Sequence, residues 1–582
     1  MDLVLIGLPG SGKSVVGRRI AHRHDATFID LDETIVRAAG RSIQAIFETE
    51  GEAGFRAREA DAVAALGPAD PDTDLRRVIA TGGGTVVDPR NRWRLNRGRL
   101  VVWLDARPEA LAQRLRHSRT VRPLVVGRDP IGAVRTLAVA RERFYATAHR
   151  VNALAEPSGV AGAIEGLLSA GDPIGATRLL DAETRIGRFV LGDGIAGIAV
   201  ADALDRLEAR RAIIVSEPAA WAAAGAGIAS GLRERGLPVE YVELPSGEAA
   251  KRLSVVEDAA RALARLRVER SEPIVAVGGG GLGDAAGLLA ALWQRGVPVI
   301  HVPTTLVAQI DSSIGGKTAV DLPEGKNLLG AFHQPAAVVI DVSFLRTLPE
   351  RQRRAALGEA VKMAALGDEP LFTLLERDGD GIARGDEATF ESGAIAELVE
   401  RTMWAKVEVV LADEREQGAV AAGVPDPLSG PGRFALNFGH STGHAFEAAG
   451  RYESLLHGEA VAYGLRVALR IGVRLEVTPP AVAARVESLL TRVGLGEGRL
   501  AFAIDVVLDA LGADKKHAGG RLRWVLATGS GVIVRADVPD ELVRDAVAEL
   551  LEPAAAGADG TAAADGTAGA GGTAGADTGA SR

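Results

Sequence analysis

Cysteine is absent from this chain of 582 residues. Its absence excludes disulfide bonds, thiolate metal sites and cysteine nucleophiles, and it fits a reducing compartment. Long apolar runs are missing as well, since none approaches the ~20 residues that span a membrane as a helix. A basic surplus is also lacking, because the formal net charge is -9. Nucleic acid and membrane are therefore not expected as partners.

The residues that are present indicate a globular protein with several domains. Hydrophobic residues make up 47% of the chain and charged residues 25%, which is an ordinary balance for a folded protein. A chain of this length predicts roughly three or four domains. The N-terminal residues MDLVLIGLPG are apolar, but no basic segment precedes them, so we expect no signal peptide. We expect a soluble, cytoplasmic protein.

The first motif follows a predicted strand over residues 3–6 and has the P-loop pattern, Gly7-Leu8-Pro9-Gly10-Ser11-Gly12-Lys13-Ser14. Backbone N–H groups of such a loop cradle phosphates, the lysine reaches the β and γ oxygens, and the Ser14 hydroxyl ligates Mg²⁺. A helical pattern follows, as this motif requires. The predicted ATP-binding residues are Gly10, Ser11, Gly12, Lys13, Ser14 and Val15.

Further polar residues in the first 166 positions indicate a small hydroxylated substrate. Asp30 and Asp32 end a second predicted strand on the same side of the chain. One carboxylate can join the Mg²⁺ shell while the other takes a proton from a substrate hydroxyl. A triple glycine after the next strand leaves bare backbone for a polyol. Arginines occupy a helix, a lid-like segment and a late helix, at Arg56, Arg122 and Arg141.

This segment, residues 1–166, resembles shikimate kinase, a small P-loop kinase similar to nucleoside-monophosphate kinases. The resemblance implies Asp32 as the base, Lys13 as a second catalytic residue, and Asp30 with Ser14 in the magnesium shell. It implies that Arg122 closes over the phosphates. The implied shikimate-binding residues are Asp32, Arg56, Gly82, Gly83, Gly84 and Arg141. Gluconate kinase is the alternative, but the Phe-Arg-x-x-Glu motif together with the triple glycine favours shikimate.

A second glycine-rich stretch follows a looser segment, residues 167–184, that we interpret as a linker. The apolar residues 274–277 predict a buried strand, and four glycines follow, Gly278 to Gly281. Glycines between a strand and a helix let the backbone approach a pyrophosphate. Many polar residues stand behind them, which favours a pocket for a phosphorylated, hydroxylated ligand: Asp284, Arg295, Thr304, Thr305, Asp311, Lys317, Lys326 and Asn327.

The chain becomes mainly helical after about residue 345 and contains a candidate metal site. Glu359 precedes Lys362 by three residues, and His440 precedes His444 by four, so each pair shares a helix face. His457 follows. A carboxylate and two or three imidazoles with an open position are typical of a catalytic zinc site. Histidines at this spacing are also often structural, so spacing alone leaves both interpretations open.

Residues 185–552 resemble 3-dehydroquinate synthase, an NAD- and metal-dependent cyclase of the shikimate pathway. The resemblance implies a Rossmann-like NAD domain over residues 185–345 and a mainly helical metal and substrate domain over residues 346–552. Glu359, His440 and His457 are the implied ligands of a zinc or cobalt ion. The implied NAD contacts are Glu248, Lys251, Gly279, Gly280, Gly281, Asp284, Thr304, Thr305, Lys326, Phe344 and Thr347.

The same resemblance implies 3-deoxy-D-arabino-heptulosonate 7-phosphate as the substrate. Its implied contacts are Arg295, Asp311, Lys317, Asn327, Lys362, Lys406, Arg433, Asn437, His444 and Lys516. Lys362, Glu416 and His444 are the implied catalytic residues. Arg295 would reach the substrate of a neighbouring subunit, which implies a homodimer.

Two departures from the family pattern and a tail stand out. Ser216 stands where the family usually has an acidic residue after a strand, and residues 417–432 form a Gly-, Ala- and Pro-rich insertion before Arg433. Such a loop is tolerated at little cost. Residues 553–582 lack aromatic residues and are expected to be disordered.

The sequence therefore predicts an α/β protein in which a P-loop kinase domain precedes a synthase unit. We expect ATP-dependent 3-phosphorylation of shikimate and NAD- and metal-dependent formation of 3-dehydroquinate with release of phosphate. Two alternatives stay open. The C-terminal unit can be another sugar-phosphate cyclase, or one half can be a catalytically silent binding module.

Overall fold

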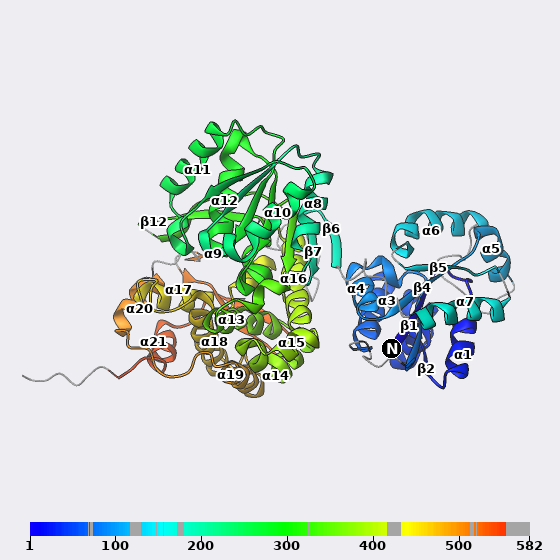
Figure 1. The fold of residues 1–582 in the computed structure, drawn as a ribbon. Helices are drawn as coiled ribbons and strands as arrows, with labels where there is room; N and C mark the ends of the chain where they lie inside the picture. The colour runs from blue at the N-terminus through cyan, green and yellow to red at the C-terminus, as the bar shows by residue number, and fades with distance from the viewer. Residues whose placement is uncertain are drawn as a thin grey trace, which may run out of the picture.

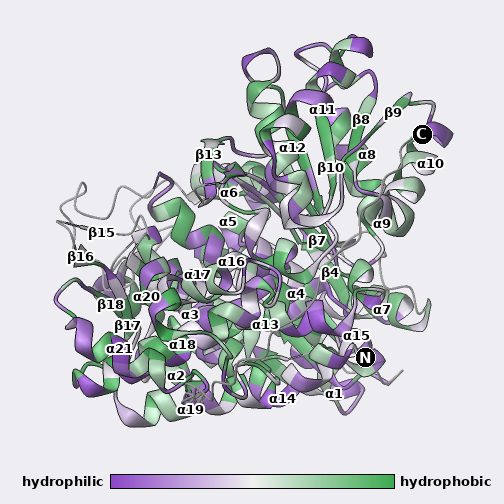
Figure 2. Cartoon of the chain, turned by 90° about the vertical axis from the view of Figure 1, so that its left-hand side faces the viewer, coloured by the Kyte–Doolittle hydropathy of each residue, from purple (hydrophilic) through white to green (hydrophobic). Residues whose placement is uncertain are grey.

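The computed structural model describes residues 1–67, 69, 74–116, 130–146, 148–154, 156–170, 180–323, 325–415, 432–512, 517–518 and 521–553. An N-terminal α/β unit lies beside a larger unit, and helix α4 faces the larger unit (Figure 1). The larger unit has a sheet layered between helices and a helical part next to it. Figure 2 shows hydrophobic residues concentrated in the strands of this sheet, such as β8 and β10.

The N-terminal unit is built on a parallel five-stranded sheet of order β2-β3-β1-β4-β5. Its central strand β1 is buried along its whole length, as expected for a parallel sheet covered by helices on both faces. The strands are β1 Asp2–Ile6, β2 Thr27–Asp30, β3 Arg77–Ala80, β4 Leu100–Asp105 and β5 His149–Asn152. The helices are α1 Lys13–Arg23, α2 Leu31–Ala39, α3 Ile43–Ala64, α4 Pro89–Asn96, α5 Pro108–Arg116, α6 Pro130–Tyr145 and α7 Pro157–Ala170.

The larger unit begins with a seven-stranded sheet of order β6-β7-β14-β11-β10-β8-β9. Strand β6 is antiparallel to β7, and the other neighbours are parallel. The strands are β6 Leu180–Thr184, β7 Gly187–Gly192, β8 Ala212–Ser216, β9 Val239–Glu243, β10 Ile274–Gly278, β11 Val299–Pro303 and β14 Ala337–Asp341. Helices α8 Ala196–Arg206 and α10 Ala226–Glu234 pack on one face. Helices α11 Leu253–Arg265 and α12 Gly280–Leu292 pack on the other.

A hairpin, β12 Lys317–Leu322 and β13 Gly325–Phe332, lies beside α12 and leads back to the sheet. The helical part then comprises α13 Glu350–Ala365, α14 Glu369–Arg384, α15 Glu387–Glu391, α16 Ala394–Ala412, α17 His440–Ala449, α18 His457–Arg474, α19 Pro480–Arg492, α20 Ile504–Gly512 and α21 Asp540–Ala548. The short strands β17 Trp524–Ala527 and β18 Val532–Arg535 form a hairpin near the end. One large hydrophobic core joins these helices to one side of the sheet.

The linker predicted over residues 167–184 is shorter in the structure. Helix α7 continues to Ala170, and β6 occupies the last five residues of the predicted linker. Strand β6 pairs with β7, and Leu180 is fully buried in the large core. Pairing with β7 makes these residues a strand, although the local sequence does not predict one.

Among the described residues, no helix combines the length and apolar character needed to cross a membrane.

His301 on β11 gives the stability of this fold a pH dependence. Burial, followed by the charge of His333, lowers the pKa of His301 to about 4. An unfolded histidine titrates near ~6.5, so between these pH values the unfolded chain binds the proton and the folded chain does not. Stability should therefore rise with pH over this window. We expect His301 to account for ~2–3 kcal/mol of the stability lost between pH 7.5 and 4.5.

Urea unfolding of the parent chain and of His301→Gln at both pH values measures this loss. The variant should lose less stability on acidification by that amount. His22→Gln, at an exposed position, is the control and should behave as the parent does. An unchanged pH dependence in His301→Gln would contradict the assignment.

Candidate active sites

The P-loop joins β1 to α1 at the carboxyl edge of the five-stranded sheet. Gly7, Gly10 and Gly12 adopt φ values of +139°, +85° and +95°, a region that suits glycine. The Lys13 ammonium folds back and donates hydrogen bonds to the carbonyl oxygens of Gly7 (2.8 Å) and Leu8 (3.1 Å). A phosphate in the loop can replace these carbonyls as the acceptor of the lysine.

A pair of oxygen donors stands next to the loop. The Ser14 hydroxyl donates to Asp30 Oδ2 at 2.6 Å. The other carboxylate oxygen, Oδ1, accepts from the backbone N–H groups of Asp32 and Glu33 and caps α2. A hydroxyl and a carboxylate held in this way fit Mg²⁺, which prefers hard oxygen ligands and keeps several waters.

The triple glycine follows β3 and lies between the predicted substrate residues. A Cβ added to Gly82 would lie 3.0 Å from Asp32 Oδ1, and one added to Gly84 would lie 2.7 Å from Arg56 Nη1. Arg141 Nη1 donates to the Gly83 carbonyl at 2.7 Å. The structure therefore brings together Asp32, Arg56, Gly82, Gly83, Gly84 and Arg141. Arg122 lies outside the described residues.

Tyr145 is part of this site, and the sequence did not point to it. Its hydroxyl donates to the same Gly83 carbonyl. Burial raises the pKa of Tyr145 to about 12, so the phenol stays protonated. The signal was its position four residues after Arg141, which places both side chains on one face of α6.

The second glycine turn joins β10 to α12 and leaves backbone exposed to a ligand. A Cβ on Gly280 would lie 2.8 Å from Ser312 Oγ, and one on Gly281 would lie 2.9 Å from the Gly247 carbonyl oxygen. Thr304 and Thr305 follow the neighbouring strand β11, and a short turn with Phe344 follows β14 and ends at Thr347. Most of the predicted NAD contacts thus meet at the carboxyl edge of the sheet, where open α/β sheets bind ligands.

The family usually has an acidic residue where this chain has Ser216, and here an acidic residue, Glu217, follows one position later. Ser216 ends β8, and its hydroxyl donates to the Val277 carbonyl at 2.8 Å. Glu217 follows, and its Oε2 accepts from the Gly247 backbone N–H at 3.0 Å. Its Oε1 lies 3.9 Å from where a Cβ of Gly279 would stand. Glu217 therefore occupies the sheet edge that a ribose-binding acid needs.

A network of charges links α12 to the hairpin β12–β13. Lys251 Nζ contacts Asp284 Oδ2 at 2.7 Å and donates to Asn327 Oδ1. Burial raises the pKa of Asp284 to about 6, although Lys251 opposes the shift. Lys326 Nζ lies 3.5 Å from Glu248 Oε1. The structure therefore places these predicted cofactor residues, and Asn327 with them, in one cluster.

The predicted metal ligands converge from α13, α17 and α18. Glu359 Oε1 lies 3.3 Å from His440 Nε2 and 3.2 Å from His457 Nε2. Tetrahedral ligands at 2.0–2.1 Å from a zinc-type ion stand about 3.3 Å apart. Both distances from Glu359 Oε1 match this spacing, and the ligand atoms of the three residues all lie within 4.8 Å of one another.

The surroundings of this triad also fit a cation. Within the described chain, both Glu359 carboxylate oxygens are buried and accept no hydrogen bond of good geometry. Burial, then the Lys362 cation, lowers the pKa of His440 to about 4, so this imidazole is neutral, as a ligand must be. Burial also acts to lower the pKa of His457, but its hydrogen bonds to Glu359 and Glu447 raise it to about 10, so His457 would release a proton on binding a metal. His440 Nδ1 faces the Phe438 carbonyl oxygen at 3.2 Å, so Nε2 is the nitrogen left for a metal.

Cationic side chains surround the triad. Lys362 is almost fully buried, and its ammonium contacts Glu359 Oε2. Lys406 Nζ on α16 donates to Asp311 Oδ1 at 2.7 Å. Arg433 is buried and donates to the carbonyl oxygens of Gly315 (3.2 Å) and Glu414 (2.7 Å).

Of the remaining predicted substrate residues, some lie near the triad and others do not. Asn437 ends a 3-10 turn that leads into α17, and the His444 ring centroid lies 5.6 Å from that of His440. Lys317 begins β12 and is exposed. Arg295 is exposed in a turn after α12, and no described contact joins it to the triad. Glu416 and Lys516 lie outside the described residues, as does nearly all of the predicted insertion.

Glu447 on α17 belongs to the site but was not predicted. It is buried, its Oε2 lies 3.3 Å from His457 Nδ1, and its Oε1 lies 3.5 Å from Lys326 Nζ. It also forms a second possible cation cluster with His444 and His457. Because it faces the other ring nitrogen of His457, we interpret Glu447 as the partner of a metal ligand. Its spacing of two helical turns from His440 was the available signal.

The sequence matches known families along most of its length. Residues 9–164 match shikimate kinase, residues 241–355 match the N-terminal part of 3-dehydroquinate synthase, and residues 356–517 match its C-terminal part. The 3-dehydroquinate synthase of Picosynechococcus sp. is 36% identical over 385 residues, which cover 64% of this chain and 100% of that protein. The enzyme of Jannaschia sp. is 40% identical over 365 residues, which cover 60% and 92%.

The chain belongs to the 3-dehydroquinate synthase family. A shikimate kinase domain precedes the synthase, so the chain is a bifunctional enzyme of the shikimate pathway. The predicted fusion and both predicted enzyme activities are confirmed.

Solved structures agree with the synthase fold. The 2-epi-5-epi-valiolone synthase of Streptomyces hygroscopicus, solved with NAD+ and Zn2+, is 29% identical with a TM-score of 0.56, and the match covers 62% of this chain and 96% of that one. A 2-deoxy-scyllo-inosose synthase, solved with NAD+ and Co2+, is 25% identical with a TM-score of 0.53, and the match covers 63% and 97%. The predicted Rossmann-like and helical architecture of the synthase is confirmed.

Proposed function

We propose that Asp32 and Lys13 carry out the kinase reaction on ATP and shikimate. Arg56 and Arg141 hold the shikimate carboxylate beside the triple glycine, which leaves the 3-hydroxyl facing Asp32. Asp32 accepts the proton of that hydroxyl, and Lys13 neutralises charge on the transferred phosphoryl group. Ser14 and Asp30 would hold Mg²⁺, which supplies charge neutralisation on the nucleotide phosphates. The common position of these residues around the glycine loop supports the proposal.

For the synthase, we infer that Glu359, His440 and His457 hold one zinc or cobalt ion and that NAD+ lies along the glycine turn after β10. The triad spacing of 3.2–3.3 Å is the observation that carries this assignment. When bound, NAD+ would accept a hydride reversibly from the carbon that bears a substrate hydroxyl, and the metal would make that hydroxyl easier to oxidise. Glu217 binds the adenosine ribose, and the N-terminus of α12 receives the pyrophosphate.

The remaining residues orient the substrate, 3-deoxy-D-arabino-heptulosonate 7-phosphate. Lys362, Lys406 and Arg433 supply cations for its carboxylate and its phosphate, and Asp311 fixes the position of the Lys406 ammonium. These groups are buried, so they bind and neutralise charge more strongly than in water. His444 stands beside the triad and can move a proton at the phosphate or at a substrate hydroxyl.

Release of inorganic phosphate from 3-deoxy-D-arabino-heptulosonate 7-phosphate tests the synthase assignment. The assay contains NAD+ and zinc or cobalt, and each is then omitted in turn, with EDTA in a separate run. We expect release only when both are present, with no accumulation of NADH. Release from a different sugar phosphate, with none from this one, would favour another sugar-phosphate cyclase.

Glu447 should strengthen metal binding, because its carboxylate contacts the proposed ligand His457 as well as Lys326 of the proposed cofactor site. The Glu447→Gln substitution keeps the shape but removes the charge that faces His457 Nδ1 and Lys326 Nζ. Losing such a partner typically weakens metal affinity by about 10–100-fold. We expect a loss of this size for Co²⁺, measured by chelator competition. Glu391→Gln, at an exposed position, should leave the Co²⁺ affinity unchanged, and parental affinity in Glu447→Gln would remove Glu447 from the site.

We also propose a homodimer in which Arg295 reaches the partner's active site. Arg295 is exposed and lies in a turn with φ of +67°, a conformation that is costly outside glycine. Sedimentation velocity should show a dimer. Mixed dimers of Arg295→Gln and Lys362→Gln should regain synthase activity, because one of their two shared sites keeps both residues. A monomer, or no regain on mixing, would contradict the shared site.

A further inference from the structure

Helix α4 of the kinase unit contributes to the cores of both units. Leu95 is buried in the hydrophobic core of the kinase unit. Trp93, two residues earlier, is 3% exposed and packs in the core of the synthase unit, where it is the only described member that precedes Leu180. Residues two positions apart point to opposite sides of a helix. The short helix is thus held between two cores.

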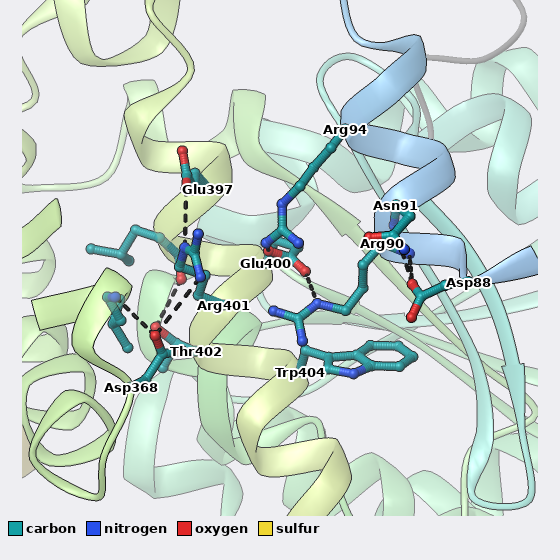
Figure 3. A network of polar contacts seen from close by, with 12 residues as sticks. Asp88, Arg90, Asn91, Arg94, Asp368, Glu397, Glu400, Arg401, Thr402 and Trp404 are labelled. Atoms are coloured by element: carbon teal, nitrogen blue, oxygen red, sulfur yellow. Dashed lines mark hydrogen bonds and ion pairs between the residues drawn. The ribbon is translucent and has the colours of Figure 1, made fainter. Parts of the chain in front are cut away.

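A buried ion triad fixes the same helix to α16 of the synthase unit (Figure 3). Glu400 on α16 has a fully buried side chain. Its Oε1 accepts from Arg90 Nε, and its Oε2 accepts from Arg94 Nη2 at 2.5 Å. The Arg90 guanidinium also lies 5.8 Å from the centre of the Trp404 ring. A buried carboxylate held by two arginines from the other unit is costly to separate, because separation leaves its charge unpaired.

Arg92 and Arg97 add further contacts between the two units. Arg92 donates to the Val86 carbonyl of its own unit at 2.8 Å and to the Asp181 carbonyl on β6 at 3.0 Å. Arg97 stacks on Trp93 with 5.0 Å between its guanidinium carbon and the ring centre. Its guanidinium covers Gly393, where φ is +75° and an added Cβ would stand 1.1 Å from Arg97 Nη2. Only glycine leaves room for the arginine at that position.

Active-site residues lie close in sequence to α4 and on α16 itself. Helix α4 begins five residues after Gly84, and the 3-10 turn Thr85–Val87 fills the interval. Asp88 caps α4 by accepting from the backbone N–H groups of Arg90 and Asn91 (Figure 3). On the other side, Lys406 stands six residues after Glu400 on α16 and holds Asp311. One continuous path of turns, helices and side-chain contacts therefore joins the triple-glycine loop to Asp311 of the synthase unit.

We propose that the α4–α16 contact makes the kinase and synthase units one cooperative folding unit, so that a ligand of the kinase also stabilises the synthase. A ligand that orders the triple glycine orders α4, and α4 carries that stabilisation to α16 through the ion triad and Trp93. By the same coupling, a ligand of the synthase also stabilises the kinase. The statement that a kinase ligand stabilises the synthase rests on the proposed kinase substrate, shikimate. The statement that the two units fold cooperatively does not depend on it.

Hydrogen exchange of the full-length protein, followed by mass spectrometry of separate peptides, tests the inference. Peptides from β1 report on the kinase core, and peptides from α18 report on the synthase core. The Glu400→Gln substitution leaves Arg90 and Arg94 without their counter-charge. We expect it to speed exchange in both cores together, on the order of 10²-fold. Acceleration confined to one unit would overturn the proposal.

Two further variants control for the loss of a surface charge and for a failure of Glu400→Gln to fold. Glu387→Gln removes an exposed partner of Arg346 within the synthase unit, and it should leave exchange in both cores unchanged. If Glu400→Gln fails to fold, the variant Arg90→Met, Arg94→Leu, Glu400→Leu replaces the triad by apolar side chains. That variant should keep the cores coupled through packing, with exchange rates near those of the parent. Independent exchange of the two cores in this variant would overturn the proposal.

Hydrogen exchange with and without shikimate tests whether a kinase ligand also stabilises the synthase. In the parent chain, it should slow exchange in β1 and in α18, and in Glu400→Gln it should slow exchange in β1 alone. Slower exchange in β1 of the parent without any change in α18 would overturn the coupling. No effect on β1 would count against the proposed kinase substrate instead, and the ligand-free comparison would still decide whether the units fold together.

Discussion

Replacing Glu359 by glutamine should abolish the synthase activity while the kinase activity persists. The amide keeps the shape of the side chain but removes the charge that faces His440, His457 and Lys362. A neutral amide is a poor ligand for a zinc-type ion, and the nearby Lys362 ammonium loses its counter-charge. We expect phosphate release to fall by more than the roughly 100-fold typical when only the partner of a metal ligand is lost.

The measurement combines phosphate release with metal content determined after dialysis. Lys362 remains buried without its partner, so stability should also fall, by about 3–5 kcal/mol. Glu391→Gln, at an exposed position, tests whether loss of a glutamate charge alone has any effect. A Glu359→Gln protein that still binds metal and turns over at the parental rate would show that the triad is not the metal site.

Replacing Lys13 by methionine should produce the opposite pattern. The ammonium group that folds back onto the loop carbonyls is lost, and with it the cation that stabilises the transferred phosphoryl group. Losing one such donor typically costs on the order of 10²–10³-fold in turnover. We expect shikimate-dependent ATP turnover to fall by this factor while phosphate release by the synthase is unchanged.

A coupled assay for ADP, run beside the phosphate-release assay, measures both activities on the same sample. Arg19→Met removes an exposed cation from the same helix and should change neither activity. If Lys13→Met abolished the synthase activity of a folded protein as well, the two reactions would be coupled in turnover and not only in stability.

Local sequence was sufficient wherever chemistry depends on consecutive residues. The P-loop needs glycines, a lysine and a serine at set positions after a strand, so the pattern specifies backbone conformation and donor placement together. The same holds for the glycine turn after β10, because the glycines both permit the turn and leave the backbone bare. The pair His440 and His444 could be placed on one helix face by counting, although counting could not choose which of them binds metal.

Three features depended on contacts between distant segments and could not be read from spacing. Glu217 follows Ser216 directly, yet only the adjacent glycine turn after β10 shows that it is the acid at the sheet edge. Glu447 joins His457 to Lys326 across three elements. Strand β6 lies in a stretch with weak local signals, and its order comes from pairing with β7.

The amino-acid sequence alone determined the two catalytic units and their order and predicted a set of candidate site residues, because motifs and periodicity are local properties of the chain. The contact between the two units, through α4 and α16, is visible only in the tertiary structure. Arginines at positions 90, 92, 94 and 97 look like a solvated helix face in sequence, since Asp88 is the single acidic residue near these four cations. Glu400, the partner of Arg90 and Arg94, lies about 300 residues away, and only folding brings that charge, and the core that buries Trp93, to the helix.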